Sequence, residues 1–412
     1  MKTADRDVIR RLATELAAMA AQPLQAERRE GWQRLNSLQD QRPMLWITEI
    51  PFGEFEERVD ELRCVCADAR LRGIERALRQ RLFTARRLRC DEVCDATWWV
   101  PKHIEGADYG VTVQEQRLPQ GGSYVFSHHY EPVIRGPEDV VRIRMPAVRH
   151  DPARTAAAVD FYTELFGDIL PVRACGPRQH FYTAWDQLVQ WTGVQEALVA
   201  LVDRPEFIHA IMRRMTDAFV ARMEQLEQQG LLDFPHPLAR VGSGAAGFTD
   251  ELPQPGYDPQ RITTMDQWGG ATCQIFGDVS PAMHDEFALQ YELEIMRRCG
   301  LNYYGCCEPV HAKMHLMARI PRLRKISISP WCDVARAAAT AQHRYVFSHK
   351  PSPAILAEQS FCPERAEADL RQRLAQSGEH ACEFIMKDIS TVRGDVQRLI
   401  DWCELAYRVL AG

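Results

Sequence analysis

The sequence predicts an α/β protein built on a parallel sheet. Short apolar segments rich in β-branched and aromatic residues alternate with helical segments along most of the chain. The segments between the strands have roughly the 10 to 20 residues that a helical crossover between parallel strands needs. The 412 residues suffice for one large domain or for two or three smaller ones. A closed barrel and a doubly wound sheet both satisfy this pattern, and periodicity alone does not separate them.

The N-terminal part predicts helices. Residues 8–32 carry apolar groups at helical spacing with many Arg, Glu and Gln residues between them, so we expect an N-terminal helical cap. The first strand is expected in Arg42-Pro43-Met44-Leu45-Trp46-Ile47, and a helix follows over residues 55–83. The next expected strands are 95–100 and 123–126, and the next expected helices are 152–166, 184–202 and 205–230.

The last third of the chain repeats the strand-and-helix unit most clearly. Such repetition is typical of βα units that build a parallel sheet. The expected strands are 272–276, 301–304, 325–328, 345–348 and 382–386. The expected helices are 281–299, 309–318, 334–341 and 363–377.

Composition excludes several classes of function. The net charge is -6 and the pI is about 6.1, with basic and acidic residues interleaved, so we expect no nucleic-acid partner and no anionic membrane surface. No apolar run reaches the roughly 20 residues that a membrane span needs. The thirteen cysteines are scattered and lack the spacing of a secreted disulfide scaffold. We therefore expect a cytoplasmic protein with reduced thiols.

A glycine-rich segment resembles a dinucleotide-binding loop only in spacing. Gly242, Gly244 and Gly247 have the Gly-x-Gly-x-x-Gly pattern, but the residues that follow do not open a helix. Residues 242–257 are rich in Gly and Pro, and we interpret them as a long loop that can lie over a site.

Polar residues follow several of the expected strands. In an α/β barrel the active site forms at the carboxyl ends of the strands, so these positions are the first candidates. They are Gly305-Cys306-Cys307-Glu308, Ser329-Pro330-Trp331, Ser348-His349-Lys350 and Lys387-Asp388.

The first of these groups predicts a metal site. Cys306, Cys307, Glu308 and His311 place two thiols, a carboxylate and an imidazole within six residues, and these are ligands that zinc prefers. Cys382, on the last strand, is the remaining thiol that we favour over His311 to complete the site. The alternative is that one cysteine of the pair packs in the core, because adjacent side chains on a strand point to opposite faces.

Other residues are candidates for substrate contact or acid-base chemistry. His128 and His129 follow an expected strand, and the alternative for them is a solvated or structural pair. His349 and Lys350 can hold a substrate carboxylate or phosphate, and the alternative is a surface position before a turn. The predicted catalytic residues are Glu308, His349 and Lys350. The predicted substrate-binding residues are His128, His129, Glu49 and Trp331.

Several motifs resemble the uroporphyrinogen decarboxylase superfamily. Arg42-Pro43-Met44-Leu45-Trp46 is similar to the early Arg-Pro-x-x-x-Trp stretch of that family, with its tryptophan one position sooner. Residues 190–193, 201–206 and 280–287 are similar to later parts of it, so the resemblance spans about residues 40–405. It implies a (β/α)8 TIM barrel of the uroporphyrinogen decarboxylase type at residues 41–412, with an N-terminal helical extension at residues 1–40.

Within this superfamily the sequence is closer to the corrinoid-linked methyltransferases than to the decarboxylases. Decarboxylases carry an Arg-Gln-Ala-Gly signature after the first strand, where this chain has Glu49. The zinc-containing thiol methyltransferases carry a His-x-Cys motif and a later cysteine near the last strand. Cys306 and Cys382, which are 76 positions apart, resemble these two cysteines, but Tyr304 replaces the histidine.

The resemblance implies a methyltransferase that moves a methyl group between a corrinoid protein and a small thiol or pterin. Zinc is expected to activate a thiol acceptor, and tetrahydrofolate is the alternative acceptor if zinc is absent. The corrinoid, as methylcobalamin, is expected on a partner protein, because the chain has no Asp-x-His-x-x-Gly sequence. The alternatives are a decarboxylase or lyase acting on a small carboxylic acid or tetrapyrrole, and a non-catalytic corrinoid- or metal-binding barrel. The sequence leaves open whether the protein forms a homodimer.

Overall fold

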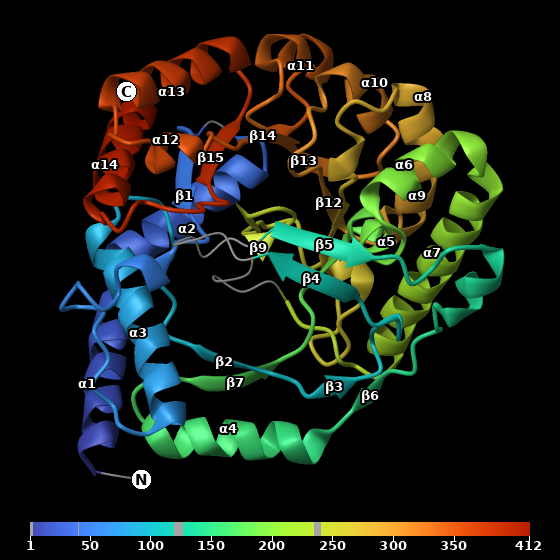
Figure 1. The fold of residues 1–412 in the computed structure, drawn as a ribbon. Helices are drawn as coiled ribbons and strands as arrows, with labels where there is room; N and C mark the ends of the chain where they lie inside the picture. Colours follow the sequence, from blue (N-terminus) through green and yellow to red (C-terminus); the bar gives the residue numbers. More distant parts are fainter. Residues whose placement is uncertain (1–2, 40, 119–126, 235–239) are drawn as a thin grey trace.

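The computed structural model describes residues 3–39, 41–118, 127–234 and 240–412. Its centre is a seven-stranded parallel sheet that curves into a TIM-like barrel, which confirms the predicted fold class (Figure 1). The strands, in spatial order, are β1 (Met44–Ile47), β15 (Cys382–Met386), β14 (Val346–His349), β13 (Leu323–Ile328), β12 (Leu301–Tyr304), β11 (Trp268–Ala271) and β8 (Gln179–Tyr182).

Helices follow the strands and form the outer layer of the ring (Figure 1). They are α3 (Ala69–Arg87), α5 (Ala184–Thr192), α6 (Val194–Asp203), α7 (Pro205–Gln228), α8 (Pro281–His284), α9 (Gln290–Met296), α10 (Met314–Met317), α11 (Val334–Ala341), α12 (Ala354–Ala357), α13 (Pro363–Ser377) and α14 (Gln397–Ala411). Among the described residues, no helix has the length and apolarity needed to cross a membrane.

Strands β1 and β8, at the two edges of this sheet, are not paired with each other in the described part of the chain. The strand that the barrel order would place there, β2 (Trp98–Pro101), pairs in parallel with β7 (Val172–Cys175) instead. Both strands pack against α4 (Pro152–Phe166), on one side of the ring in Figure 1. The barrel is therefore completed on this side by a separate two-stranded sheet.

Two sequence-based boundaries are corrected, and a third cannot be compared. The strand expected at residues 272–276 ends at Ala271, and Gln274–Phe276 forms a 3-10 helix. The helix expected at residues 184–202 divides at Gly193, whose φ of 88° interrupts α-helical geometry. The strand expected at residues 123–126 lies outside the described residues.

Alternate residues of each barrel strand face inward and outward. On β12, Leu301 and Tyr303 pack inside the barrel against Trp268, whereas Tyr304 packs in the outer core between sheet and helices. The same alternation on β15 turns Glu383 inward and Phe384 outward. This alternation decides which of the polar residues near the strand ends can reach the mouth of the barrel.

The Gly242-x-Gly244-x-x-Gly247 segment fills the barrel interior. It forms a hairpin of β9 (Arg240–Val241) and β10 (Ala245–Ala246), and Ser243 Oγ lies 2.9 Å from the hydroxyl of Tyr303. A Cβ atom on Gly242 would lie 2.1 Å from the ring of Tyr303, so only glycine fits. These glycines therefore allow close packing inside the barrel, where the sequence predicts a long loop that can lie over a site.

The predicted N-terminal helices are present. Helix α1 (Thr3–Ala20) packs on α3 and α4, and α2 (Pro23–Asn36) packs on β1. Trp32 of α2 lies against Met44 and Val346, the first residues of β1 and β14. Helix α2 therefore covers the amino ends of these strands, and the site must be sought at the opposite end.

Candidate functional site

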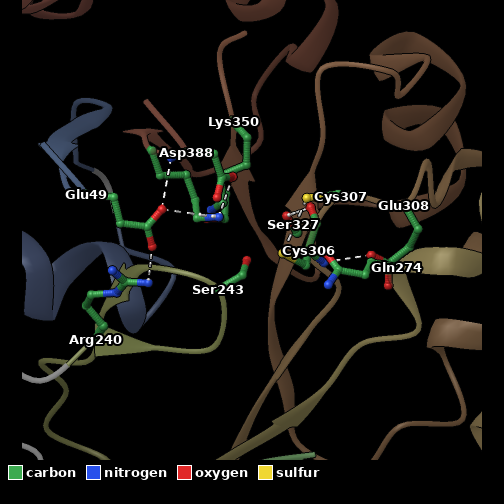
Figure 2. A network of polar contacts seen from close by, with 12 residues as sticks. Glu49, Arg240, Ser243, Gln274, Cys306, Cys307, Glu308, Ser327, Lys350 and Asp388 are labelled. Atoms are coloured by element: carbon green, nitrogen blue, oxygen red, sulfur yellow. Dashed lines mark hydrogen bonds and ion pairs between the residues drawn. The ribbon is translucent and has the colours of Figure 1, made fainter. Parts of the chain in front are cut away.

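Charged side chains gather at the carboxyl ends of β1, β14 and β15. Glu49 follows β1 and accepts hydrogen bonds from Arg240 Nη2 at 2.8 Å and from the backbone N–H of Asp388 at 2.9 Å. Lys387 Nζ lies 2.5 Å from Asp388 Oδ2 and 3.9 Å from Glu49 Oε2. The interior hairpin supplies Arg240, so the packed glycine turn also positions a charged residue of the site (Figure 2).

Burial and neighbouring charges change the pKa values of Glu49 and of Lys350, which follows β14. Burial opposes ionisation of Glu49, but Lys387, the Asp388 N–H group and Arg240 together hold the pKa of Glu49 below its usual value. Burial lowers the pKa of Lys350 to about 8, although the Glu383 carboxylate acts in the other direction. Lys350 Nζ donates to the hydroxyl oxygens of Ser348 at 2.5 Å and Tyr303 at 3.1 Å. Glu49 is thus a carboxylate at neutral pH, and Lys350 titrates close to neutrality.

The thiol pair lies beside this charged group. Cys306 and Cys307 follow β12, with their sulfur atoms 3.6 Å apart, and Ser327 Oγ donates to the carbonyl of Cys306 at 2.8 Å. Figure 2 shows the pair facing Lys350 and Asp388. The hydrogen bond between the two thiols raises the pKa of Cys306 and lowers that of Cys307, and Lys387 favours the thiolate of both. Cys307, the exposed member, is therefore the more acidic thiol.

Glu308 links the loop after β11 to the loop after β12 through hydrogen bonds. Its carboxylate is fully buried and accepts hydrogen bonds from Thr272 Oγ1 at 2.9 and 3.0 Å and from the backbone N–H groups of Cys273 at 3.2 Å and Cys306 at 2.8 Å. These donors occupy both carboxylate oxygens and fix the loop that carries the thiol pair. Glu308 therefore positions this loop, and its catalytic role stays a prediction.

Cys307 opens onto a wide cleft of about 960 Å³. Trp331 is 73% exposed and lines the same cleft, as its place after β13 led us to expect. The other lining residues come from α6, from the segments after β11 and β12, and from α8; they are Leu198, Leu201, Gln274, Ile275, Gly277, Asp278, Val279, Ser280, Met283 and Pro309. The wall is largely apolar, and its polar side chains are the Cys307 thiol, the Gln274 amide, the Asp278 carboxylate and the Ser280 hydroxyl.

Asp186 is a titratable residue of this region that the sequence did not single out. It lies on α5, just after β8, and accepts a hydrogen bond from Gln274 Nε2 at 2.8 Å. Burial raises the pKa of Asp186 to about 6, and the nearby Glu308 charge adds to the rise. Its Oδ1 atom is buried without a hydrogen-bond partner. Recognition of residues 179–182 as a strand would have identified Asp186 as a residue after a strand end.

Two predicted site residues face away from the cleft. His349 is an outward residue of β14, with Nε2 2.8 Å from Ser377 Oγ of α13 and its ring stacked on Phe384, so the structure does not bring it together with the other predicted catalytic residues. Cys382 is the first residue of β15 and donates its S–H to the carbonyl of His380, at the amino end of the barrel. It lies four residues before the end of that strand and does not meet Cys306.

The remaining histidines are also separate from the thiol pair. His311 Nδ1 accepts a hydrogen bond from the backbone N–H of Asp333 at 3.1 Å, which holds the start of α11. His128 and His129 lie exposed on β5 (Ser127–Glu131), paired with β4 (Gln114–Leu118), and His128 contacts Glu115 at 2.8 Å. Strand β5 packs on α5, so this hairpin lies at the carboxyl end of the barrel.

The donors expected to bind zinc do not converge. Across residues 3–39, 41–118, 127–234 and 240–412, no group of three His, Cys, Asp or Glu side chains is placed to hold a metal ion. Cys382 lies at the other end of the barrel, Glu308 is fully hydrogen bonded, and Lys387 places an ammonium beside the two thiols. The thiol pair thus supplies two soft donors, whereas a structural or catalytic zinc needs three or four protein ligands.

Comparison with known proteins identifies the fold. No protein-family model matches the sequence, and no curated protein matches it. The solved structure of a methyltransferase from Methanosarcina mazei is similar, with a TM-score of 0.50 and 9% sequence identity, covering 92% of this chain and 98% of that chain. Similarity over nearly the full length of both chains at so low an identity shows a shared fold.

Proposed function

We propose that the protein is a methyltransferase that moves a methyl group between a corrinoid carried by a partner protein and a small acceptor bound in the cleft. One observation carries the proposal: Cys307, a thiol with a lowered pKa, opens onto a cleft of about 960 Å³ at the carboxyl end of the barrel. The likeness of the fold to a methyltransferase supports it.

The charged groups support a polar acceptor such as a pterin. Methyl transfer is a displacement in which the acceptor atom supplies an electron pair and the leaving group keeps the old bonding pair. Glu49 and Asp388 can accept hydrogen bonds from ring N–H groups, and Arg240 and Lys387 can bind carboxylates. Because the zinc ligands do not converge, tetrahydrofolate is favoured over a zinc-activated thiol as the acceptor.

Residues of the chain have separate roles in this proposal. Cys307 contacts the reacting groups in the cleft, and Glu308 holds the loop that positions it. Lys387 keeps positive charge beside the thiols, and Lys350, with a pKa of about 8, can hold or release a proton near neutral pH. The exposed indole of Trp331 gives the rim of the cleft a flat apolar surface on which a large planar group can stack.

The test uses methylcobalamin as the probe donor, with tetrahydrofolate and 2-mercaptoethanol as alternative acceptors. Loss of the methylcobalamin spectrum and mass spectrometry of the acceptor measure transfer. We expect the intact protein to methylate tetrahydrofolate above the rate without protein and Cys307→Ser to reduce the rate at least about tenfold. Cys362→Ser, a partly exposed cysteine before α13, is the matched control and should keep the parent rate.

Two results would overturn the proposal. One is the absence of methylation of either acceptor above the rate without protein. The other is release of carbon dioxide from a small carboxylic acid without any corrinoid, which would establish the decarboxylase alternative. Methylation of 2-mercaptoethanol alone would support methyl transfer and contradict the pterin acceptor.

A further inference from the structure

A second cavity lies outside the cleft and shares no lining residue with it. It has a volume of about 370 Å³ and lies where β2 and β7 end, beside α7. Pro101, Ile104 and Leu226 form part of its apolar wall. The lining also includes three cationic residues, Lys102, Arg178 and Arg222. An apolar hollow with a few convergent polar groups is the usual form of a small-molecule site.

The three cationic residues differ in whether a carboxylate of the protein pairs with them. Lys102 Nζ lies 3.3 Å from Asp233 Oδ2 and donates to the carbonyl of Leu231 at 3.2 Å, so its charge is balanced. Arg178 and Arg222 have no carboxylate within ion-pair distance in the described part of the chain. The cavity therefore carries positive charge that the protein does not neutralise.

Arg222 is held in place without a protein anion. It projects from α7 with its guanidinium carbon 4.1 Å from the centre of the Phe219 ring, and its Nε atom is buried without a hydrogen-bond partner. Burial lowers the pKa of Arg222, and among the described residues the Tyr109 side chain alone acts in the other direction. A buried donor without an acceptor lowers the stability of the fold, and a bound anion would remove that cost.

We propose that this cavity binds a small organic anion whose carboxylate or phosphate pairs with Arg222 and Arg178 and whose apolar part packs on Ile104 and Leu226. The planar guanidinium groups match either anion through paired N–H donors. The volume limits the ligand to a small molecule such as an aromatic or branched acid. This site is independent of the proposed methyl transfer, because it lies apart from Cys307 and the charged strand ends.

The test measures binding by calorimetry with three probes that share one ring: benzoate, phenyl phosphate and benzyl alcohol. We expect at least one anion to bind and benzyl alcohol, which lacks charge, to bind at least about tenfold more weakly. Arg222→Gln and Arg178→Gln should each weaken binding of that anion at least about tenfold. Arg371→Gln, an exposed arginine on α13, should bind it like the parent. Preference for benzoate would identify a carboxylate ligand, and preference for phenyl phosphate a phosphate ligand.

Stability gives a second readout that does not need the natural ligand. Without a probe, Arg222→Gln should unfold at the same or a higher denaturant concentration than the parent, because it removes a guanidinium whose Nε atom is buried without a hydrogen-bond partner. Equal binding of benzyl alcohol and the anions would overturn the proposal. So would unchanged anion affinity in Arg222→Gln, or a parent protein that binds neither anion while Arg222→Gln is less stable than the parent.

Discussion

Lys325 and Glu383 form an ion pair in the centre of the barrel, with Nζ 2.6 Å from Oε2 and both side chains fully buried. Lys325 lies on β13 and Glu383 on β15, and Lys325 also donates to the carbonyl of Ala246 in the interior hairpin at 2.9 Å. The pair therefore joins two strands to the segment that fills the barrel.

Loss of one partner should strongly destabilise the fold. Glu383→Gln leaves the Lys325 ammonium buried without its counter-charge, and we expect the free energy of unfolding to fall by about 3 to 5 kcal/mol. Urea denaturation followed by circular dichroism measures the change. Glu367→Gln, which breaks an exposed pair with Arg371 on α13, is the control and should cost less than about 1 kcal/mol. A similar small loss in both variants would show that the buried pair is not important for stability.

Cys307 should be the first thiol to react in the native protein. It is exposed and has a lowered pKa, so a larger fraction is thiolate at neutral pH than for an ordinary cysteine. Brief treatment with iodoacetamide and peptide mass spectrometry should find Cys307 labelled well before Cys382, whose pKa burial raises to about 12. Earlier labelling of Cys382 would contradict the placement of these two thiols.

Cys382 should not contribute to metal binding. It lies at the amino end of β15, and Cys306 lies beyond the carboxyl end of β12. Elemental analysis of protein grown with added zinc should give the same metal content for Cys382→Ser as for the parent. Loss of zinc in both Cys382→Ser and Cys306→Ser would show that the two thiols share a metal ion.

Lys350 should make stability rise with pH in the alkaline range. Its pKa is about 8 in the folded protein and 10.5 ordinarily, so the unfolded chain holds the proton more tightly. The contribution is fully present above about pH 10.5 and is lost as the pH falls to about 8, with a size on the order of 3 kcal/mol. Lys350→Met should remove this rise, whereas Lys102→Met should keep it. Denaturant midpoints across this range measure the slope, and an unchanged slope in Lys350→Met would contradict the lowered pKa.

Asp186 should act with the opposite sign in the acid range. Its pKa is about 6 in the folded protein and 3.8 ordinarily, so the folded state holds the proton more tightly. Its contribution to stability is present below about pH 4 and is lost as the pH rises through about 6, on the order of 3 kcal/mol. Asp186→Asn should reduce this dependence, and Asp160→Asn, an exposed control on α4, should not. Identical pH profiles for Asp186→Asn and the parent would exclude a buried, shifted carboxyl.

Most residues of the candidate site were predictable because they follow predicted strands. Glu49, Cys306, Cys307, Lys350 and Trp331 all follow strands, and the structure brings them to the carboxyl end of the barrel. This was predictable because parallel strands place their carboxyl ends on one side of a sheet. Arg240 and Asp186 were not found, because one reaches the site from an interior hairpin and the other follows a strand without a clear apolar pattern.

By itself, the sequence determined the alternation of strands and helices in the last third of the chain, the parallel sheet and the residues just beyond most strand ends, because these depend on local periodicity. Only the tertiary structure decided which side chains meet. Alternation along a strand turned His349 outward toward α13, while the start of β15 placed Cys382 at the amino end of the barrel. The direction of a side chain and its height along a barrel depend on strand register, and hydrogen bonds between segments distant in sequence set that register.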